Sequence, residues 1–394
     1  RGDPSELWRH EGYLRTNPFQ AGYLQYSEVL QRVFGRRSYV PQGLINAAFL
    51  TAAYGALMDL SWRSLNDRRV QVAAVLLLTL CVQPVCFTTF LYGNLPGLCL
   101  SLWALDCLLR WLTGGRRRWL VPALMLMALA VVLKPNYLIF ALAAALVTAL
   151  YALGSRRLGA LLVCAGLLAA PMAADRLARL ALEKRTGFPL GEGAPQTTWL
   201  AMGMQEGPIA PGWYNRYSLT LMGRAELDPD TALALNRQDI AQRLSEFAAD
   251  PAYALSFYHE KMVSQWAETT FEAMLVNRVM PSESPFPALV SSLLSGGGSH
   301  ALALYMEGYT LTLYLGFAAG TALLAIGLFR RRAWDWTRLY APLALMVAVL
   351  GGFLYHMLFE AKSQYLMIYL PMMTPLSAWG LAWRRENVKA TPAP

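Results

Sequence analysis

Charged side chains interrupt the long apolar segments of the sequence at two places. Lys134 separates two apolar segments, and Glu360, Lys362 and Tyr365 lie in a short polar stretch between two others. A charge beside hydrocarbon is costly in free energy, so these side chains are the first functional candidates. An ammonium group can pair with a lipid phosphate, and a glutamate can bind sugar hydroxyls. The alternatives are a lysine that reaches toward water at a helix end, and an ordinary solvated turn.

The polar segments add carboxylate, aromatic and amide candidates. Asp3 and Glu11 precede the segment Tyr13–Gln20 and are either candidate general bases or ordinary surface acids. Farther along the chain, Trp199 follows the polar residues Gln196–Thr198. Such groups stack on sugar rings and bind their hydroxyls, but they also build the cores of ordinary loops. The sequence contains no Walker loop, dinucleotide fingerprint, metal motif or serine-hydrolase elbow.

The composition is that of a membrane protein. Hydrophobic residues make up 56% of the 394 residues and charged residues 15%, whereas soluble proteins carry about 25% charged residues. The net charge of +9 arises mainly from arginines clustered between apolar segments, as orientation signals are, so nucleic acid is not expected as a partner. All five cysteines lie inside apolar segments, which gives no disulfide framework and no metal-ligand spacing.

Nine apolar segments approach the ~20 residues that a membrane-spanning helix needs. They are continuous and lack two-residue alternation, which indicates helices and not barrel strands. We therefore predict an all-α polytopic membrane protein with about nine transmembrane helices. The segments are Leu44–Leu60, Val70–Leu91, Leu95–Leu112, Trp119–Leu133, Tyr137–Leu153, Leu158–Ala174, Leu302–Phe329, Leu339–Phe359 and Tyr365–Trp383.

Every second connection between these segments is rich in arginine. Because basic residues favour the cytoplasmic side, the other connections are expected on the outer face of the plasma membrane. The arginine-rich connections contain Arg63, Arg68 and Arg69; Arg116, Arg117 and Arg118; Arg156 and Arg157; Arg330, Arg331 and Arg332; and Arg384 and Arg385. The predicted domains are a first outer loop (1–42), six transmembrane helices (43–175), a large outer loop domain (176–301), three transmembrane helices (302–384) and a cytoplasmic tail (385–394).

The two outer segments have a predicted helical organisation of their own. An amphipathic stretch, Tyr23–Phe34, is expected to lie along the membrane surface. In the large loop, Asp228-Pro229 and Asp250-Pro251 each predict the start of a helix, and the glycines of Ser295–Ser299 predict a flexible link. Since no apolar helix precedes residues 1–42 and Arg1 stands in place of a start methionine, we expect a first helix upstream of this chain.

The layout and several short stretches resemble the GT-C membrane glycosyltransferases, in particular the bacterial branch related to protein O-mannosyltransferases and aminoarabinose transferases (glycosyltransferase family 39 type). The resemblance spans nearly the whole chain and rests on layout and weak motifs. The matching stretches are Tyr13–Gln20, Glu28–Gly35, Tyr92–Gly97, Lys134–Ile139, Trp199–Gly203 through Gly212–Asn215, Lys261–Trp266 and Glu360–Pro371.

The resemblance implies a transferase that takes a sugar from a polyprenyl-phosphate carrier and passes it to a glycan, lipid or protein acceptor on the outer face. In the family, an acidic residue soon after the first helix acts as base or metal ligand, so a divalent metal ion stays open as a cofactor. Asp3 and Glu11 lie late in the corresponding loop, so the equivalent acid is expected upstream of Arg1. The candidate residues for binding carrier and substrate are Arg15, Gln20, Tyr92, Lys134, Asn136, Trp199, Glu360, Lys362 and Tyr365.

Two other functions stay open. A transporter or flippase of a lipid-linked sugar predicts ionisable residues inside the membrane and repeated halves. Asp59, Asp106 and Arg110 do lie within apolar segments, but Asp106 can pair with Arg110 one helical turn later. The third possibility is a non-catalytic subunit of a glycan-assembly complex.

Overall fold

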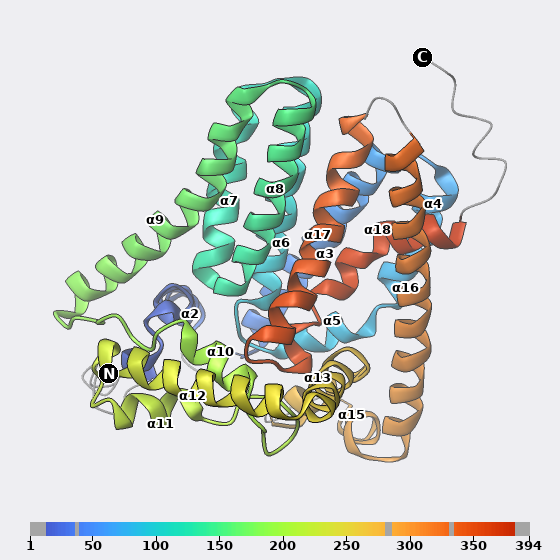
Figure 1. Cartoon of the computed structure of the whole chain (residues 1–394). Helices are drawn as coiled ribbons and strands as arrows, with labels where there is room; N and C mark the ends of the chain where they lie inside the picture. The colour runs from blue at the N-terminus through green and yellow to red at the C-terminus, as the bar shows by residue number, and fades with distance from the viewer. Residues whose placement is uncertain (1–12, 36–38, 280–285, 331–334, 383–394) are drawn as a thin grey trace.

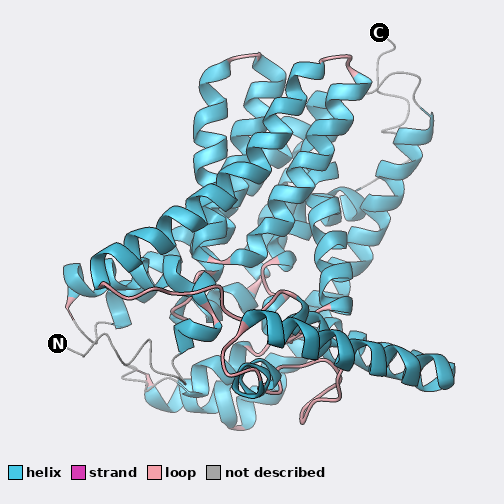
Figure 2. Cartoon of the chain, turned by 60° about the vertical axis from the view of Figure 1, so that its left-hand side comes forward, coloured by secondary structure: helices cyan, strands magenta, loops and turns pink. Residues whose placement is uncertain are grey.

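The chain forms a bundle of helices with a layer of shorter helices across one end (Figures 1 and 2). The computed structural model describes residues 13–35, 39–279, 286–330 and 335–382, and within these ranges it contains helices and no strand, as predicted. We call residues 190–279, which form most of the layer, the loop domain. The bundle helices are α3 (Tyr39–Leu65), α4 (Arg68–Leu80), α5 (Val82–Cys86), η3 (Phe87–Thr89), α6 (Asn94–Gly114), η4 (Arg117–Trp119), α7 (Leu120–Leu133), η5 (Pro135–Tyr137), α8 (Leu138–Gly154), η6 (Leu158–Ala160), α9 (Leu161–Thr186), α16 (Gly297–Arg330), α17 (Trp336–Leu358) and α18 (Tyr369–Ala382).

Six of the described helices are long and apolar enough to cross a membrane. They are α3, α6, α8 with η5, α9 with η6, α16 and α17. A seventh span results if α4 and the helices after it count as one span that bends by 42°. The predicted number of nine is not confirmed, because α7 and the described part of α18, which reaches the last described residue, have 14 residues each. At 1.5 Å per residue these 14 residues cover about 21 Å, less than the hydrocarbon thickness of about 30 Å.

Most of α18 lies inside the bundle. Every residue from Tyr369 to Ala378 is buried, and the helix packs against α4, α16 and α17. Its approach to α16 depends on Gly320, where a Cβ atom would lie 2.0 Å from the carbonyl oxygen of Leu376. The stretch Tyr369–Ala378 therefore faces protein on all sides, although the composition of α18 alone resembles that of a helix in lipid.

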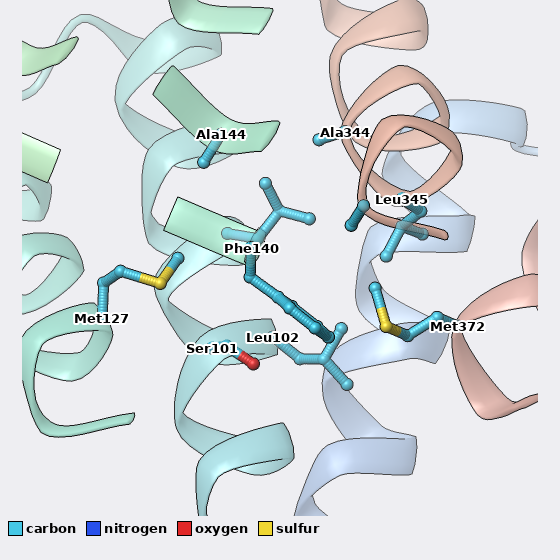
Figure 3. Close-up of a pocket in the computed structure, with 10 residues that line it drawn as sticks. Ser101, Leu102, Met127, Phe140, Ala144, Ala344, Leu345 and Met372 are labelled. Atoms are coloured by element: carbon cyan, nitrogen blue, oxygen red, sulfur yellow. The ribbon is translucent and has the colours of Figure 1, made fainter. Parts of the chain in front are cut away.

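The side chains of α6, α7, α8, α17 and α18 that meet in the interior leave a small recess (Figure 3). A recess lined by Ser101, Phe140, Leu345 and Met372, among others, holds only about 10 Å³, close to the minimum for one water molecule. The hydroxyl of Ser101 already donates to the carbonyl oxygen of Leu98 at 3.0 Å. This part of the bundle therefore has no room for a sugar.

Two acids and two arginines form a network toward the arginine-rich end of α3 and α6. Arg110 lies 2.5 Å from both Asp106 and Asp59, and Arg63 lies 3.0 Å from Asp59. The predicted pairing of Asp106 with Arg110 is confirmed. These charges therefore join α3 to α6 and need no transported substrate to explain them.

Replacing Asp106 with alanine is expected to lower the free energy of unfolding by about 3 kcal/mol, because it leaves a partly buried arginine pair with one acid. Thermal unfolding in detergent measures the loss. Asp230→Ala, at an exposed position early in α12 (Pro229–Ala249), is the matched control and should change stability little. Equal unfolding temperatures for the two variants would show that the network contributes nothing.

The remaining helices lie at the end of the bundle that carries the loop domain. Both predicted Asp-Pro helix starts are confirmed, since Asp228 accepts from the Thr231 amide at 2.8 Å and Asp250 from the Tyr253 amide at 3.0 Å. The predicted helix over 23–34 is also present, as α2. These helices are α1 (Tyr13–Thr16), η2 (Pro18–Gln20), α2 (Ala21–Phe34), α10 (Thr197–Gly203), α11 (Tyr217–Arg224), α12, α13 (Pro251–Trp266), α14 (Ala273–Val279), α15 (Pro287–Ser295) and η7 (Ser363–Tyr365).

One local prediction is wrong. The glycine-rich stretch Ser295–Ser299 is not an open link, because α15 ends at Ser295 and α16 already begins at Gly297. The amide of Gly296 donates to the carbonyl oxygens of Ser291 and Ser292, both at 3.0 Å, and this closes a tight helix-to-helix turn. The glycines fit a sharp change of direction here, and not a flexible segment.

Candidate functional site

Three connections meet where the bundle contacts the loop domain. The first lies just before α6, the second joins α7 to η5, and the third joins α17 to α18. Tyr92, Lys134 and Tyr365 come from these three connections, and the ammonium group of Lys134 lies over both tyrosine rings. The amide of Gln20, at the end of η2, donates to the hydroxyl of Tyr92. Residues that are far apart in the sequence thus form one cluster.

Lys134 is buried in this cluster and is 3% exposed. Its Nζ atom donates to Asn94 Oδ1 at 2.7 Å and lies 5.1 Å from the centre of the Tyr92 ring and 5.3 Å from that of Tyr365. Both rings stabilise the positive charge through cation–π contacts. An ammonium group has three donors, and Asn94 is the one hydrogen-bond partner that the described residues give it. Lys134 does not reach toward water, and it retains donors for an anion.

Glu360 is close enough to Lys134 for their charges to interact, and it is 9% exposed. Its Oε1 atom accepts from the Tyr365 hydroxyl at 3.0 Å. Three lysines, Lys362, Lys134 and Lys261, are close enough for their charges to act on this carboxylate. The stretch that carries Glu360 is therefore packed against protein and is not a solvated turn.

Burial moves three pKa values in this cluster toward neutrality. Desolvation raises the pKa of Glu360 to about 7, although Tyr365 and the three lysines favour the charged form. Desolvation also lowers the pKa of Lys134 and of Lys261 to about 7, against the attraction of Glu360. Groups with a pKa near 7 can gain or lose a proton at neutral pH, as a general acid or base must.

The loop domain holds the backbone on both sides of Glu360. The amide of Glu360 donates to the Trp199 carbonyl oxygen at 2.7 Å, and the amide of Ala361 donates to that of Gly212 at 2.9 Å. Lys261, fully buried on α13, donates from Nζ to the carbonyl oxygens of Gly203 at 2.5 Å and Phe359 at 2.9 Å. The position of Glu360 therefore depends on helices of the loop domain as well as on α17.

This arrangement needs a glycine at position 203. A Cβ atom there would lie 2.4 Å from the carbonyl carbon of Phe359 and 2.5 Å from the oxygen of Leu358. Gly203→Ala is therefore expected to push the segment Phe359–Ala361 away and to cost about 1–3 kcal/mol. Hydrogen–deuterium exchange at the amides of Glu360 and Ala361 should become faster. The control is Gly223→Ala in α11, where nothing lies within 4 Å of the added Cβ; slow exchange in both variants would contradict the prediction.

Comparison of the chain with protein-family models, curated proteins and solved structures finds no match. The functional argument therefore rests on the side chains themselves. Among the described residues, no group of three or more His, Cys, Asp or Glu side chains is placed to hold a metal ion. A divalent metal ion of the kind that the resemblance leaves open would therefore need ligands outside these residues.

The structure brings most of the predicted binding residues to one place. Tyr92, Lys134, Glu360 and Tyr365 form the cluster, while Gln20 and Trp199 contact its members. Trp199 takes part through its carbonyl oxygen, and its ring packs edge-on against Phe19 at 5.4 Å. Its predicted role as a sugar-stacking ring is therefore not visible in these contacts.

The other predicted residues lie at the edge of the cluster or apart from it. Lys362 is half-buried, and its charge favours the ionised form of Glu272, whose pKa is raised by burial. Asn136 is half-buried in η5, and Arg15 is exposed on α1. The two candidate bases, Asp3 and Glu11, lie outside the described residues.

Three residues of the site had no role in the sequence-based prediction. Asn94, which accepts from Lys134, has the sequence context of an ordinary helix start. Lys261 belongs to one of the stretches that carry the family resemblance, but its sequence gives no sign of its backbone partners. His356 is 1% exposed, its ring stacks on Tyr365 at 5.8 Å, and neither ring nitrogen has a hydrogen-bond partner among the described residues. The sequence did offer one sign of His356, because a histidine inside an apolar segment is rare and often functional.

Proposed function

We propose that this chain is an integral membrane glycosyltransferase that moves a sugar from a polyprenyl-phosphate carrier to an acceptor hydroxyl. The observation that carries the proposal is Lys134, a buried ammonium group with donors to spare beside the carboxylate of Glu360. A lipid phosphate suits this position because its hydrocarbon chain can stay among apolar helices while its charge reaches the lysine. The resemblance to GT-C glycosyltransferases supports the same reading.

The chemistry follows from these two groups. Glu360 takes the proton of the acceptor hydroxyl while the acceptor oxygen bonds to the anomeric carbon of the sugar. The bond from that carbon to the phosphate oxygen breaks, and its electron pair leaves with the carrier phosphate. Lys134 binds this phosphate and stabilises the charge that develops on it. Attack from the side opposite the phosphate inverts the configuration of the sugar.

The proposed enzyme lies in the plasma membrane with the loop domain on the outer face. The support is the alternation of arginine-rich connections, since basic residues favour the cytoplasmic side. In this arrangement, α7 and α18 join the longer helices to give nine membrane segments.

Two alternatives receive less support. A flippase needs a polar route through the bundle, whereas the core around Ser101 is packed and the acids of α3 and α6 are paired with arginines. A non-catalytic subunit does not need a carboxylate and an ammonium group that both titrate near neutral pH. Titrating groups of this kind are typical of functional sites.

The experiment is transfer of radiolabel from a polyprenyl-phosphate sugar to endogenous acceptors, in membranes that contain the protein. We expect label in a glycan, lipid or protein acceptor that is missing from membranes without the protein. Labelled carrier that crosses the bilayer intact, with no acceptor labelled, would support the flippase instead. If neither sugar transfer nor crossing of the carrier is observed, the remaining role is that of a non-catalytic subunit.

A further inference from the structure

A second buried carboxylate lies in the turn that joins α13 to α14. Glu272 is 8% exposed, and its Oε2 atom has no hydrogen-bond partner among the described residues. Its carboxylate is close enough to Lys362 for their charges to interact, yet the two described side chains form no direct ion pair. A buried polar atom without a partner costs free energy, so this oxygen needs an explanation. The proposed mechanism does not use it.

The turn holds Glu272 in a strained backbone conformation. Phe271 and Glu272 have φ angles of 50° and 56°, in the left-handed region that bulky residues rarely adopt. The Glu268 carboxylate accepts from the amides of Thr270 at 3.2 Å and Glu272 at 3.0 Å. The side chain of Phe271 is fully buried in the core of the bundle. Strain of this kind persists only where the surrounding structure fixes the conformation, and it is common at functional sites.

The bundle fixes the same turn from the other side. Gln83 of α5 is fully buried, and its Nε2 atom donates to the Thr269 carbonyl oxygen at 3.1 Å and to the Thr310 hydroxyl of α16 at 3.2 Å. On α14, the side-chain amide of Asn277 donates to the Cys86 carbonyl oxygen at 2.9 Å. Glu272 is therefore held at a fixed place on the bundle, as a binding group must be.

Lys362 provides a donor near this acceptor. It follows Glu360 by two residues and is half-buried, and its ammonium group has no hydrogen-bond or ion-pair partner among the described residues. Its charge favours the ionised forms of both Glu360 and Glu272, so it lies near both. The hydroxyl of Ser363, the next residue, is buried and also lacks a partner in the described part of the chain. A carboxylate and an ammonium group that are close but unpaired can both bond to one ligand.

The ligand that fits these two groups carries hydroxyls. A hydroxyl donates one hydrogen bond and accepts others, so it can satisfy both a carboxylate and an ammonium group. An ionised phosphate would be repelled by Glu272, and an ammonium group by Lys362. Sugars carry hydroxyls on neighbouring carbons, which can bond to the two side chains together.

We propose that Glu272 and Lys362 bind hydroxyl groups of the sugar that is transferred. The inference rests on the proposed function, and it adds to it the pair of side chains that recognises the sugar. In that mechanism the anomeric carbon lies between the phosphate at Lys134 and the acceptor oxygen at Glu360. The rest of the sugar ring therefore lies beside these residues, where Lys362 and Glu272 face its hydroxyls.

This contact selects the sugar and also helps the carrier to leave. A hydroxyl that is missing or inverted leaves the buried oxygen of Glu272 unpaired, and such a loss discriminates strongly between substrates. After transfer, the carrier keeps its phosphate but no longer has the sugar. It then lacks the contacts with Glu272 and Lys362, so the spent carrier binds more weakly than the loaded one.

The test compares bare and sugar-bearing carriers on the full chain in phosphatidylcholine nanodiscs. Bound radiolabelled polyprenyl phosphate is displaced by unlabelled polyprenyl phosphate, or by polyprenyl phosphates that carry mannose, glucose, galactose or N-acetylglucosamine. We expect one sugar to raise the affinity about 10- to 100-fold over the bare carrier, as hydrogen bonds to charged groups do. Glu272→Gln should lose most of this gain and bind the bare carrier as the wild type does. Glu260→Gln, at an exposed position on α13, is the matched control and should keep the gain.

A second variant repeats the test if Glu272→Gln fails to fold. Lys362→Met removes the ammonium group from a half-buried position and keeps the length of the side chain. It should lose the gain from the sugar in the same way. An equal loss of affinity for bare and sugar-bearing carriers would assign Lys362 to the phosphate and overturn the proposal.

The outcomes separate this inference from the proposed function. No gain from any of the sugars in the wild type, or an unchanged gain in Glu272→Gln, overturns the sugar contact, while sugar transfer by the wild type would still support the transferase. Unchanged carrier binding in Glu272→Gln, with a higher KM for the acceptor, would assign the pair to the acceptor and likewise overturn the proposal. A wild-type chain that binds no carrier and transfers no sugar would remove the proposed function, and this inference with it.

Discussion

Lys134→Ala is expected to lower sugar transfer about 100- to 1,000-fold, as removal of one buried donor to a developing negative charge does in other enzymes. The structure gives the reason, because Lys134 is the ammonium group that lies buried between Tyr92 and Tyr365 with donors to spare. In the proposed mechanism, its loss removes both the attraction for the carrier phosphate and the stabilisation of the leaving group. Transfer rates measured at several carrier concentrations would show a lower kcat together with a higher KM.

Two further variants make this result specific. Lys134→Arg keeps the positive charge and should recover part of the transfer that alanine loses, although the larger planar group binds phosphate with different geometry. Lys184→Ala removes an exposed lysine in the last turn of α9 and should transfer sugar at the wild-type rate. Full activity in Lys134→Ala, with normal expression, would remove Lys134 from the mechanism.

Glu360→Gln is expected to lower kcat about 100- to 10,000-fold, the range that a general base contributes. In the wild type, Glu360 must be ionised to take a proton, so activity falls as pH drops below its pKa of about 7. Lys134 must be protonated to hold the phosphate, so activity also falls as pH rises above its pKa of about 7. The profile of kcat/KM against pH should therefore be a narrow bell with its maximum near neutrality.

Variants should change one side of this bell at a time. Glu360→Gln should abolish the acidic limb in whatever activity remains, and Lys134→Arg should move the basic limb to higher pH because a guanidinium stays charged. Lys261, which also has a pKa near 7, acts on Glu360 and holds its backbone, so it contributes to the basic limb that remains in Lys134→Arg. Glu260→Gln, at an exposed position on α13, is the control. A flat profile in the wild type would show that neither buried group titrates during turnover.

The parts of the fold that depend on local sequence could be predicted. The helix starts at Asp228 and Asp250 were predictable because a capping carboxylate and a following proline act within one turn. The number of membrane spans was not predictable in the same way. The composition of α18 is that of a lipid-facing helix, yet Tyr369–Ala378 is surrounded by protein, and no local pattern distinguishes these two environments.

In the candidate site, too, some residues could be identified from local sequence and others only from the packing. Lys134 and Glu360 could be found because a charge within apolar sequence is rare and costly. Asn94 and Lys261 could not, since their roles depend on partners 40 and 98 residues away, Lys134 and Phe359. Gly203 likewise has no distinctive sequence context. Only the packing of α10 against the end of α17 shows that a Cβ atom has no room at this position.

The backbone bonds that join Glu360 and Ala361 to the loop domain also link the two halves of the proposed reaction thermodynamically. A ligand that shifts α10 also shifts Glu360, because the Trp199 carbonyl oxygen accepts from the amide of that same residue. In the proposed enzyme, an acceptor that shifts α10 on binding therefore changes the affinity for the lipid phosphate at Lys134. By linkage, the lipid phosphate changes the affinity for the acceptor by the same factor. In the proposed enzyme, one short segment, Phe359–Ala361, then carries the coupling between the two substrates.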